Sequence, residues 1–269
     1  MHTFTVSATN TSAAWVAACR ALDVKANPRR EGFHTVVRIA DATAEDPALR
    51  AELERVRAAA GYQPIETVAN TVFPARLAAL CPDPAQLAER YQQIYSRLTK
   101  MDTGNRRGTY FGRIVAYPGQ DGPVDQLEYL VKQLRQQAAG KGPMSAAYEV
   151  GLAHPGDGDP EPQEEASFAV PVHLAGKDHS VRGFPCLSHC SFQMDRDRTL
   201  HAVALYRSHY MLDRAYGNYL GLGRLLAYLA AAAGLRPGTL TVMAGHAQIE
   251  DHITKVRPLL QDTPSLLTA

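Results

Sequence analysis

The sequence predicts an α+β fold on one core, and three observations point to this class. Helical and strand patterns are mixed along the 269 residues without strict strand–helix alternation. Hydrophobic residues make up 45% and charged residues 20%, close to the averages of globular proteins. The loop at 151–164 is rich in Gly, Pro and acidic residues, but strand patterns continue on both sides of it. We therefore predict a single domain over 1–269, with an insertion at 151–180.

The first half of the chain shows helical periodicity in four places and one strand. Residues 12–22 and 46–60 carry Ala, Leu, Arg and Glu at helical spacing. The turn pair Asn27-Pro28 leads into a strand at 32–39. Asp83 followed by Pro84 is an N-cap pair that begins a helix over 83–101. An apolar stripe at i, i+3, i+4 and i+7 predicts a helix over 124–138.

The second half is rich in strand patterns. Strands are expected at 167–174, 185–194 and 199–207, and the charged run 195–198 predicts the hairpin connection between the last two. A long apolar helix follows over 214–234, with Gly234 as its C-cap. A final strand at 239–245 leads into a short helix around 246–256. The glycines inside the long helix predict close helix packing at Gly217, Gly221 and Gly223.

Charge and cysteine content restrict the class of partner. The formal net charge is +1, which gives no global field for nucleic acid or an anionic membrane. The cysteines are too few for a disulfide framework, so reduced thiols and a cytoplasmic protein are expected; they are Cys19, Cys81, Cys186 and Cys190. We expect no signal peptide, because the first residues lack a basic region followed by an apolar run. The apolar stretch 216–235 falls short of a membrane span.

Residues that carry chemistry follow one another in a fixed order after position 184. Cys186, preceded by Pro, opens a strand, and Arg207-Ser208 closes the next one 21 residues later. Asn218, at the head of the long helix, follows Arg207 by 11 residues, and His246, at a strand end, lies 28 further on. This order and spacing resemble thymidylate synthase and the related pyrimidine nucleotide hydroxymethylases.

The resemblance extends upstream of Cys186. The segment 108–113 followed by Asp125-Gln126 is similar to a Tyr-Gly segment and helix of that family, and 146–150 is similar to one of its strands. Arg29-Arg30 resembles the family's phosphate-holding loop, and Glu66 follows Arg29 by 37 residues, a distance suited to the family's catalytic glutamate. The resemblance is strongest over 105–256, so 1–104 is a divergent N-terminal part.

The resemblance implies a fold, a reaction and a set of residues. It implies a thymidylate synthase-like mixed β-sheet with flanking helices, and a homodimer with a shared active site. The reaction would be hydroxymethylation or methylation at C5 of a pyrimidine nucleoside monophosphate, with 5,10-methylenetetrahydrofolate as the cofactor. The implied catalytic residues are Cys186, Glu66, Ser188 and His189. The implied nucleotide-binding residues are Arg29, Arg30, Lys141, Arg207, Ser208, Asn218, His246 and Gln248. Tyr210 stands where the family binds the pterin with an aspartate.

The chemistry explains why these residue types are needed. A thiolate that adds at C6 of a pyrimidine makes C5 nucleophilic, and a nearby arginine is expected to lower the thiol pKa. Counting from Pro185 places Cys186 at the nucleophile position, whereas counting from Gln193 places Ser188 there. Regular alternation would put Cys186, Ser188 and Cys190 on one face of the strand.

Two other classes of function remain open from the sequence. One is a nucleotide-binding relative that has lost the folate chemistry. The other is a metal-dependent hydrolase built on a Cys/His cluster, with candidate ligands Cys186, Cys190, His189, His246 and His252. If the protein binds a pyrimidine nucleotide, with or without the one-carbon transfer, the amide of Asn218 predicts a preference for uracil over cytosine.

Overall fold

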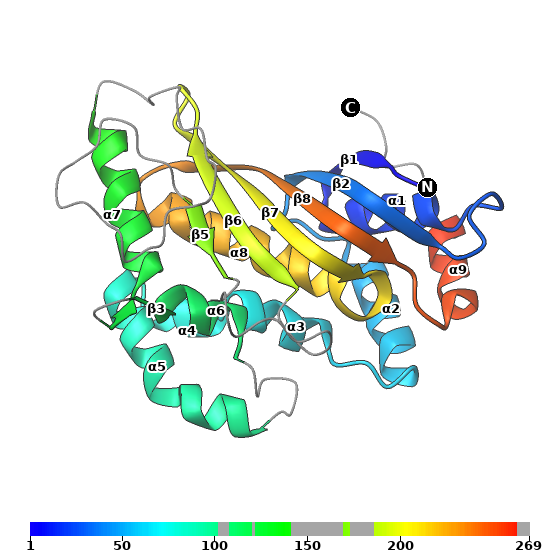
Figure 1. Ribbon diagram of the computed structural model, residues 1–269, viewed down its shortest axis with the longest axis horizontal. Helices are drawn as coiled ribbons and strands as arrows, with labels where there is room; N and C mark the ends of the chain where they lie inside the picture. Colours follow the sequence, from blue (N-terminus) through cyan, green and yellow to red (C-terminus); the bar gives the residue numbers. More distant parts are fainter. Residues whose placement is uncertain (102–107, 120–121, 141–168, 173–185, 263–269) are drawn as a thin grey trace.

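The structure is a computed structural model of the chain, and it describes residues 1–101, 108–119, 122–140, 169–172 and 186–262 (Figure 1). The described strands form a six-stranded mixed sheet in the order β1-β2-β8-β7-β6-β5. The β1/β2 and β7/β8 pairs are parallel, and the other pairs are antiparallel. The strands are β1 (Thr5–Asn10), β2 (Glu31–Asp41), β5 (Ala169–Pro171), β6 (Leu187–Met194), β7 (Thr199–Tyr210) and β8 (Arg236–Gln248). A separate pair joins β3 (Tyr117–Pro118) to β4 (Pro123–Val124).

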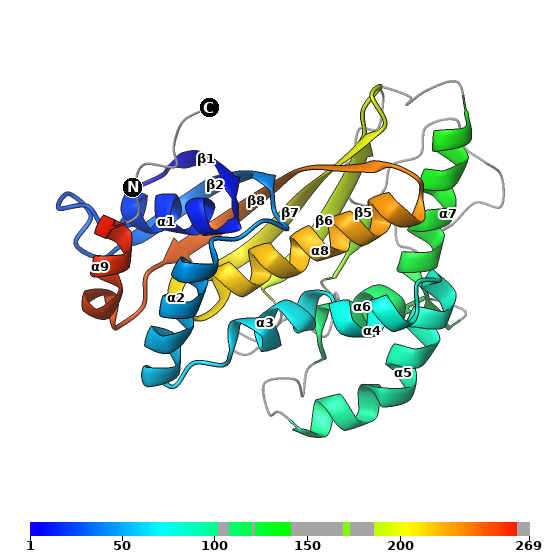
Figure 2. The same ribbon diagram turned by 180° about the vertical axis from the view of Figure 1, so that it is seen from behind.

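Helices cover one face of this sheet. Figure 1 looks onto the face that the described helices leave open, and Figure 2 shows α1 (Thr11–Leu22) and α8 (Tyr216–Ala232) lying across the other. The remaining helices are α2 (Pro47–Ala59), α3 (Ile65–Val72), α4 (Ala75–Leu80), α5 (Pro84–Met101), α6 (Tyr110–Val115), α7 (Gln126–Ala139) and α9 (Ile253–Asp262). One connected cluster of buried apolar residues joins the sheet and the helices. The α+β class with a mixed sheet and flanking helices is therefore confirmed.

Local sequence signals explain several helix boundaries. The side chain of Asn10 accepts a hydrogen bond from the Ala13 N–H at the start of α1, and Asp46 and Asp125 cap α2 and α7 in the same way. These caps satisfy backbone N–H groups that have no partner inside the helix. Just after the C-terminal end of α8, Gly234 adopts a left-handed φ of 69°, as expected of a C-cap glycine.

Gly217 and Gly221 of α8 allow the close helix packing that was predicted, here with α3, whereas Gly223 lies against Ala42, outside the helices. A Cβ placed on Gly217 would lie 2.6 Å from Cβ of Val68, and one on Gly221 would lie 2.6 Å from the carbonyl oxygen of Ala69. Real Cβ atoms do not approach their neighbours this closely. The backbone of α8 at these two glycines therefore packs directly against α3.

The alternation of buried side chains changes phase at one level across three neighbouring strands. In β7 the even positions 202, 204 and 206 are buried, and then His209 is buried. The same change occurs in β8 after Ala244 and in β2 before Thr35. His34, at this level of β2, has a left-handed φ of 51°, which departs from the extended backbone of a strand. Two consecutive residues at this level are incompletely buried in each strand.

Some predicted elements need correction. The short helix expected around 246–256 is wrong at its start, because β8 continues to Gln248 between β2 and β7 and α9 begins at Ile253. The sequence patterns did not predict β1, α3, α4 and α6. The predicted strand at 167–174 is described only at 169–172, and most of the predicted insertion lies outside the described residues. Within the described part of the chain, no helix has both the length and the apolar character to cross a membrane.

Candidate active site

Several predicted site residues meet at one end of the sheet. The strands β7 and β8 run parallel and end together, and β2 begins beside the end of β8. Ser208 pairs with His246, which pairs in turn with Phe33, and the Phe33 and His246 rings lie 5.1 Å apart. Tyr210, which is exposed, pairs with Gln248. The neighbour of Ser208, Arg207, lies at the level where burial changes phase.

Cys186 lies beside this group, immediately before β6. Its carbonyl oxygen accepts a hydrogen bond of 2.8 Å from the Arg207 backbone N–H. Its own backbone N–H donates to the hydroxyl of Tyr110, on α6, at 3.3 Å. Tyr110 is half-buried, and burial raises its pKa to about 12. The structure thus brings Cys186 together with Arg207 and with a tyrosine that was not among the predicted site residues.

Burial and charge act in opposite directions on the Cys186 thiol. Burial raises its pKa, while Arg207, Arg214 and a hydrogen bond from the Ser208 backbone N–H lower it by a smaller amount. The net effect is a raised pKa, so the expectation of a lowered thiol pKa is wrong. The physical reason is desolvation, which disfavours the thiolate more than two guanidinium groups favour it.

A buried aromatic group continues from the thiol towards α8. Tyr206 is fully buried, and its hydroxyl has no hydrogen-bond partner among the described residues. The His209 ring stacks on the Tyr206 ring with centroids 4.4 Å apart and 14° between the planes. The side-chain nitrogen Nδ2 of Asn218 lies 3.1 Å from Nε2 of His209. The contact with His209 therefore connects Asn218 to the site. Spacing along the sequence does not reveal this contact.

A π-helical turn, Met211–Ala215, connects β7 to α8 and carries Arg214. The Trp15 indole N–H donates to the Met211 carbonyl oxygen at 2.7 Å, and the buried Arg57 guanidinium donates to that of Leu212. The Glu250 carboxylate accepts from two successive backbone N–H groups of the turn, each at 2.9 Å. π-Helical turns occur often at functional sites. The turn fixes the backbone between Arg207 and Asn218.

The second candidate nucleophile, Ser188, is placed differently. The pairing of β6 with β7 is irregular between Leu187 and His189, so the strand does not alternate regularly there. The prediction that Cys186, Ser188 and Cys190 share one face is therefore wrong. The Ser188 hydroxyl donates to the Leu205 carbonyl oxygen at 3.0 Å, and Cys190 is buried in the core. His189 is half-buried and pairs with Leu205.

Glu66 is held in an ion-pair network. Both of its carboxylate oxygens accept from the Arg224 guanidinium, at 2.8 and 3.0 Å, and Arg50 lies 3.6 Å away. Hydrogen bonding to Arg224 lowers the pKa of Glu66. These contacts join α3 to α8 and keep the carboxylate ionised. They give Glu66 a structural explanation beside the catalytic one that the resemblance implies.

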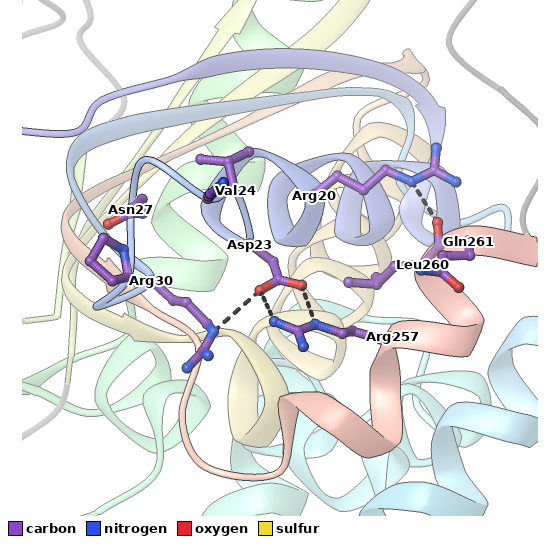
Figure 3. A pocket seen from close by; sticks show the side chains of 10 residues that line it. Arg20, Asp23, Val24, Asn27, Arg30, Arg257, Leu260 and Gln261 are labelled. Atoms are coloured by element: carbon purple, nitrogen blue, oxygen red, sulfur yellow. Dashed lines mark hydrogen bonds and ion pairs between the residues drawn. The ribbon is translucent and has the colours of Figure 1, made fainter.

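The two N-terminal arginines lie in the turn before β2. Arg29 is exposed. Arg30 lines a pocket of about 800 Å³ between α1 and α9, and its Nε bonds to Asp23 at 3.2 Å (Figure 3). Arg257 holds the same carboxylate through two hydrogen bonds, and these contacts lower the pKa of Asp23. Lys141, the remaining predicted cation, lies outside the described residues.

The cysteines and histidines do not gather into a metal site in the described part of the chain. No group of three or more His, Cys, Asp or Glu side chains there could hold a metal ion. His252 has a left-handed φ of 80° and contacts the Tyr62 ring at 6.1 Å, away from β6. The hydrolase alternative therefore has no observation in its favour.

Comparisons with known proteins agree with the sequence resemblance. The chain is 31% identical over 132 residues to a protein of Methanococcoides burtonii named "putative thymidylate synthase", and 29% identical over 131 residues to one of that name from Methanosarcina barkeri. About half of the chain is thus similar to proteins that carry this name. Each alignment covers 49% of this chain, and 49% or 48% of the relative, so it spans about half the length of the curated relatives. No protein-family model matches the sequence.

A likeness to a solved structure was also found. The crystal structure of thymidylate synthase from T4 phage aligns with 90% of this chain and 76% of its own, at a TM-score of 0.47 and 14% sequence identity.

Proposed function

We propose that this protein transfers a one-carbon unit to C5 of a pyrimidine nucleoside monophosphate, with Cys186 as the nucleophile. The observation that carries the proposal is the position of the Cys186 thiol beside Arg207, Arg214 and the Ser208 N–H. A half-buried thiol beside two guanidinium groups suits a ligand with an anionic group and an electrophilic carbon. The names of the curated relatives support the same reaction class.

Each residue has a role in this proposal. Arg207 and Ser208 bind the nucleotide phosphate through charge-assisted hydrogen bonds. His246 and Gln248, the neighbours of Ser208 and Tyr210 on β8, contact the sugar side of the nucleotide. Asn218 meets the polar edge of the base, and uracil is the preferred base. The Tyr110 hydroxyl accepts a hydrogen bond from the Cys186 backbone N–H. Tyr110 thereby holds the backbone immediately before β6, where the thiol lies.

The covalent step begins with loss of the Cys186 proton to solvent. The thiolate sulfur forms a bond to C6, and the C5–C6 π electrons move to C5 and O4 as an enolate. C5 can then take a proton from solvent, or bond to a carbon electrophile. Loss of a proton from C5 and departure of the thiolate from C6 restore the double bond. Exchange of the C5 hydrogen with solvent therefore reports the covalent step in the absence of any cofactor.

Methylenetetrahydrofolate is the expected source of the one-carbon unit. It supplies an electrophilic carbon at the oxidation level of formaldehyde. Tyr210 fits such a group, since its exposed ring at the end of β7 offers a flat surface on which a pterin can stack. Tyr210 therefore holds the pterin by stacking in place of a carboxylate contact.

We also propose that the open face of the sheet forms a homodimer interface. Leu205 and Met243 lie directly opposite each other on β7 and β8, and they are 42% and 39% exposed. Phe33, on β2, is 37% exposed. Large apolar side chains on three adjacent strands form a patch typical of a surface that another protein covers. A second copy of this chain presents the same apolar patch, as a two-fold interface requires.

The test of the proposed activity is C5 exchange with tritiated or deuterated nucleotide. Wild-type protein should bind UMP or dUMP and exchange the C5 hydrogen. Cys186→Ala should still bind the nucleotide but lose the exchange. Cys81→Ala, a half-buried cysteine on another element, is the control and should exchange normally. Exchange that survives in Cys186→Ala and is lost in Ser188→Ala would assign the nucleophile to Ser188.

The raised pKa of Cys186 favours a second candidate, a nucleotide-binding protein without the transfer reaction. A protonated thiol binds beside a pyrimidine without attacking it. Tight binding of a pyrimidine monophosphate with no C5 exchange from pH 7 to 9 would select this candidate. Failure to bind any pyrimidine nucleotide would exclude both.

A further inference from the structure

The environment of His209 keeps the imidazole in its neutral form. The side chain is 2% exposed, stacked on Tyr206 and in edge contact with Tyr219, whose ring centroid is 5.5 Å away. Burial lowers its pKa to about 3, so the ring is neutral near pH 7. A neutral imidazole has one nitrogen that donates and one that accepts.

The contact with Asn218 determines which nitrogen accepts. The amide nitrogen Nδ2 of Asn218 has no lone pair to offer, so it donates across the 3.1 Å to Nε2 of His209. His209 Nε2 is then the acceptor, and the proton lies on Nδ1. Turning the amide by 180° would bring its oxygen against Nε2, and two acceptors would then face each other unless the imidazole proton moved from Nδ1 to Nε2. In the Nδ1-protonated tautomer, the imidazole therefore holds the carboxamide of Asn218 in the orientation that the structure shows.

The orientation of an amide matters for base recognition. Uracil presents an N3–H donor beside the O4 acceptor, whereas cytosine presents an N3 acceptor beside an amino donor. An amide that turns freely matches either edge, because turning exchanges its donor and its acceptor. An amide held in one orientation pairs with the polar edge of one base. With the other base it leaves polar groups unpaired, and that base binds more weakly.

We propose that His209 is a positioning residue for base selection, which holds the Asn218 amide so that the site distinguishes uracil from cytosine. This inference rests on the proposed binding of a pyrimidine nucleoside monophosphate. It adds to that proposal that selectivity comes from a pair of residues and not from Asn218 alone.

Two variants separate the hydrogen bond from the packing. His209→Phe keeps a flat ring against Tyr206 and removes both nitrogens. His209→Gln supplies an amide oxygen that can again accept from Asn218. Tyr219→Phe is the matched control, because it keeps the ring at the edge of the imidazole and leaves the His209–Asn218 contact unchanged.

The measurement is the ratio of dissociation constants for CMP and UMP, and for dCMP and dUMP. We expect wild type and Tyr219→Phe to discriminate roughly tenfold or more, the factor that corresponds to about one lost hydrogen bond. His209→Phe should lower the ratio to less than about threefold, and His209→Gln should restore part of it. An unchanged ratio in a folded His209→Phe protein would overturn the inference and leave the proposed function standing.

A readout without nucleotide completes the test. Nitrogen-15 NMR of the free protein should show His209 with a protonated Nδ1 and an unprotonated Nε2, and Asn218→Ala should shift the Nε2 resonance. A protonated Nε2 would overturn the inference whatever the protein binds. If the tautomer is as expected but no nucleotide binds, the proposed function fails and base selection fails with it.

Discussion

At the scale of single residues, the Cys186 thiol gives a prediction about pH. Its pKa lies above the ordinary thiol value because burial outweighs Arg207 and Arg214. The unreactive thiol therefore dominates at neutral pH, and the thiolate increases as pH rises through the raised pKa. We expect alkylation of Cys186 by iodoacetamide, followed by mass spectrometry of its peptide, to have its midpoint above about pH 8.5.

Arg214 supplies the control for this measurement. Arg214→Met removes a positive charge that favours the thiolate and should move the midpoint to still higher pH. Arg55→Met removes a fully exposed charge on α2 and should leave the midpoint where it is. A wild-type midpoint at or below that of an ordinary thiol would contradict the burial argument.

Glu66 gives a second prediction at this scale, because its ion pair and its implied catalytic role have different consequences. Glu66→Gln weakens the bidentate contact with Arg224. We expect the free energy of unfolding to fall by up to about 1 kcal/mol, the usual worth of a partly exposed pair, while C5 exchange continues. Urea denaturation and the exchange assay measure the two effects. Normal stability with no exchange would instead support the catalytic role.

At the scale of elements, the contact between α8 and α3 sets two effects against each other at Gly221. Helix propensity alone predicts that Gly221→Ala stabilises the protein by about 1 kcal/mol. The new Cβ would, however, lie 2.6 Å from the Ala69 carbonyl oxygen, and overpacking costs about 1–3 kcal/mol. We expect a net loss in the free energy of unfolding, measured by urea denaturation. A gain in stability would show that the helices separate easily at this position.

Elements with strong local signals were predictable from the sequence. The cap at Asp83 located α5, and the apolar stripe over 124–138 located α7, each within two residues. The helix α3 has no side-chain cap at Pro64 and is short, so its pattern does not stand out. β8 extends past Gly245 because partners on both sides pair with it, and that support is invisible in the local sequence.

The same distinction applies to the site. The order of Cys186, Arg207 and His246 indicated residues that the neighbouring strands β6, β7 and β8 bring together. The positions of Arg214 and His209 depend on the π-helical turn and on a ring stack, which have no spacing signature. The burial that raises the Cys186 pKa is a property of the folded chain, so the sequence indicated Arg207 and missed the larger opposing effect.

At the scale of the whole molecule, the open face of the sheet predicts the oligomeric state. We expect light scattering after size exclusion to give a dimer at micromolar concentration. Leu205→Glu places a charge in the centre of the proposed interface and should give a folded monomer. Leu80→Glu alters a side chain that is 80% exposed on α4 and should stay dimeric. A monomeric wild type would exclude the interface.

The clamp that Glu250 places on the π-helical turn has a consequence for the order of folding. The acceptor oxygens lie 38 and 37 residues beyond the two N–H groups that they bind. In the chain, α8 and β8 lie between the turn and Glu250, and closing such a loop costs entropy that the contacts of these elements offset. We infer that the turn between Arg207 and Asn218 is completed late, so a partly folded chain has a core before it has a nucleotide site.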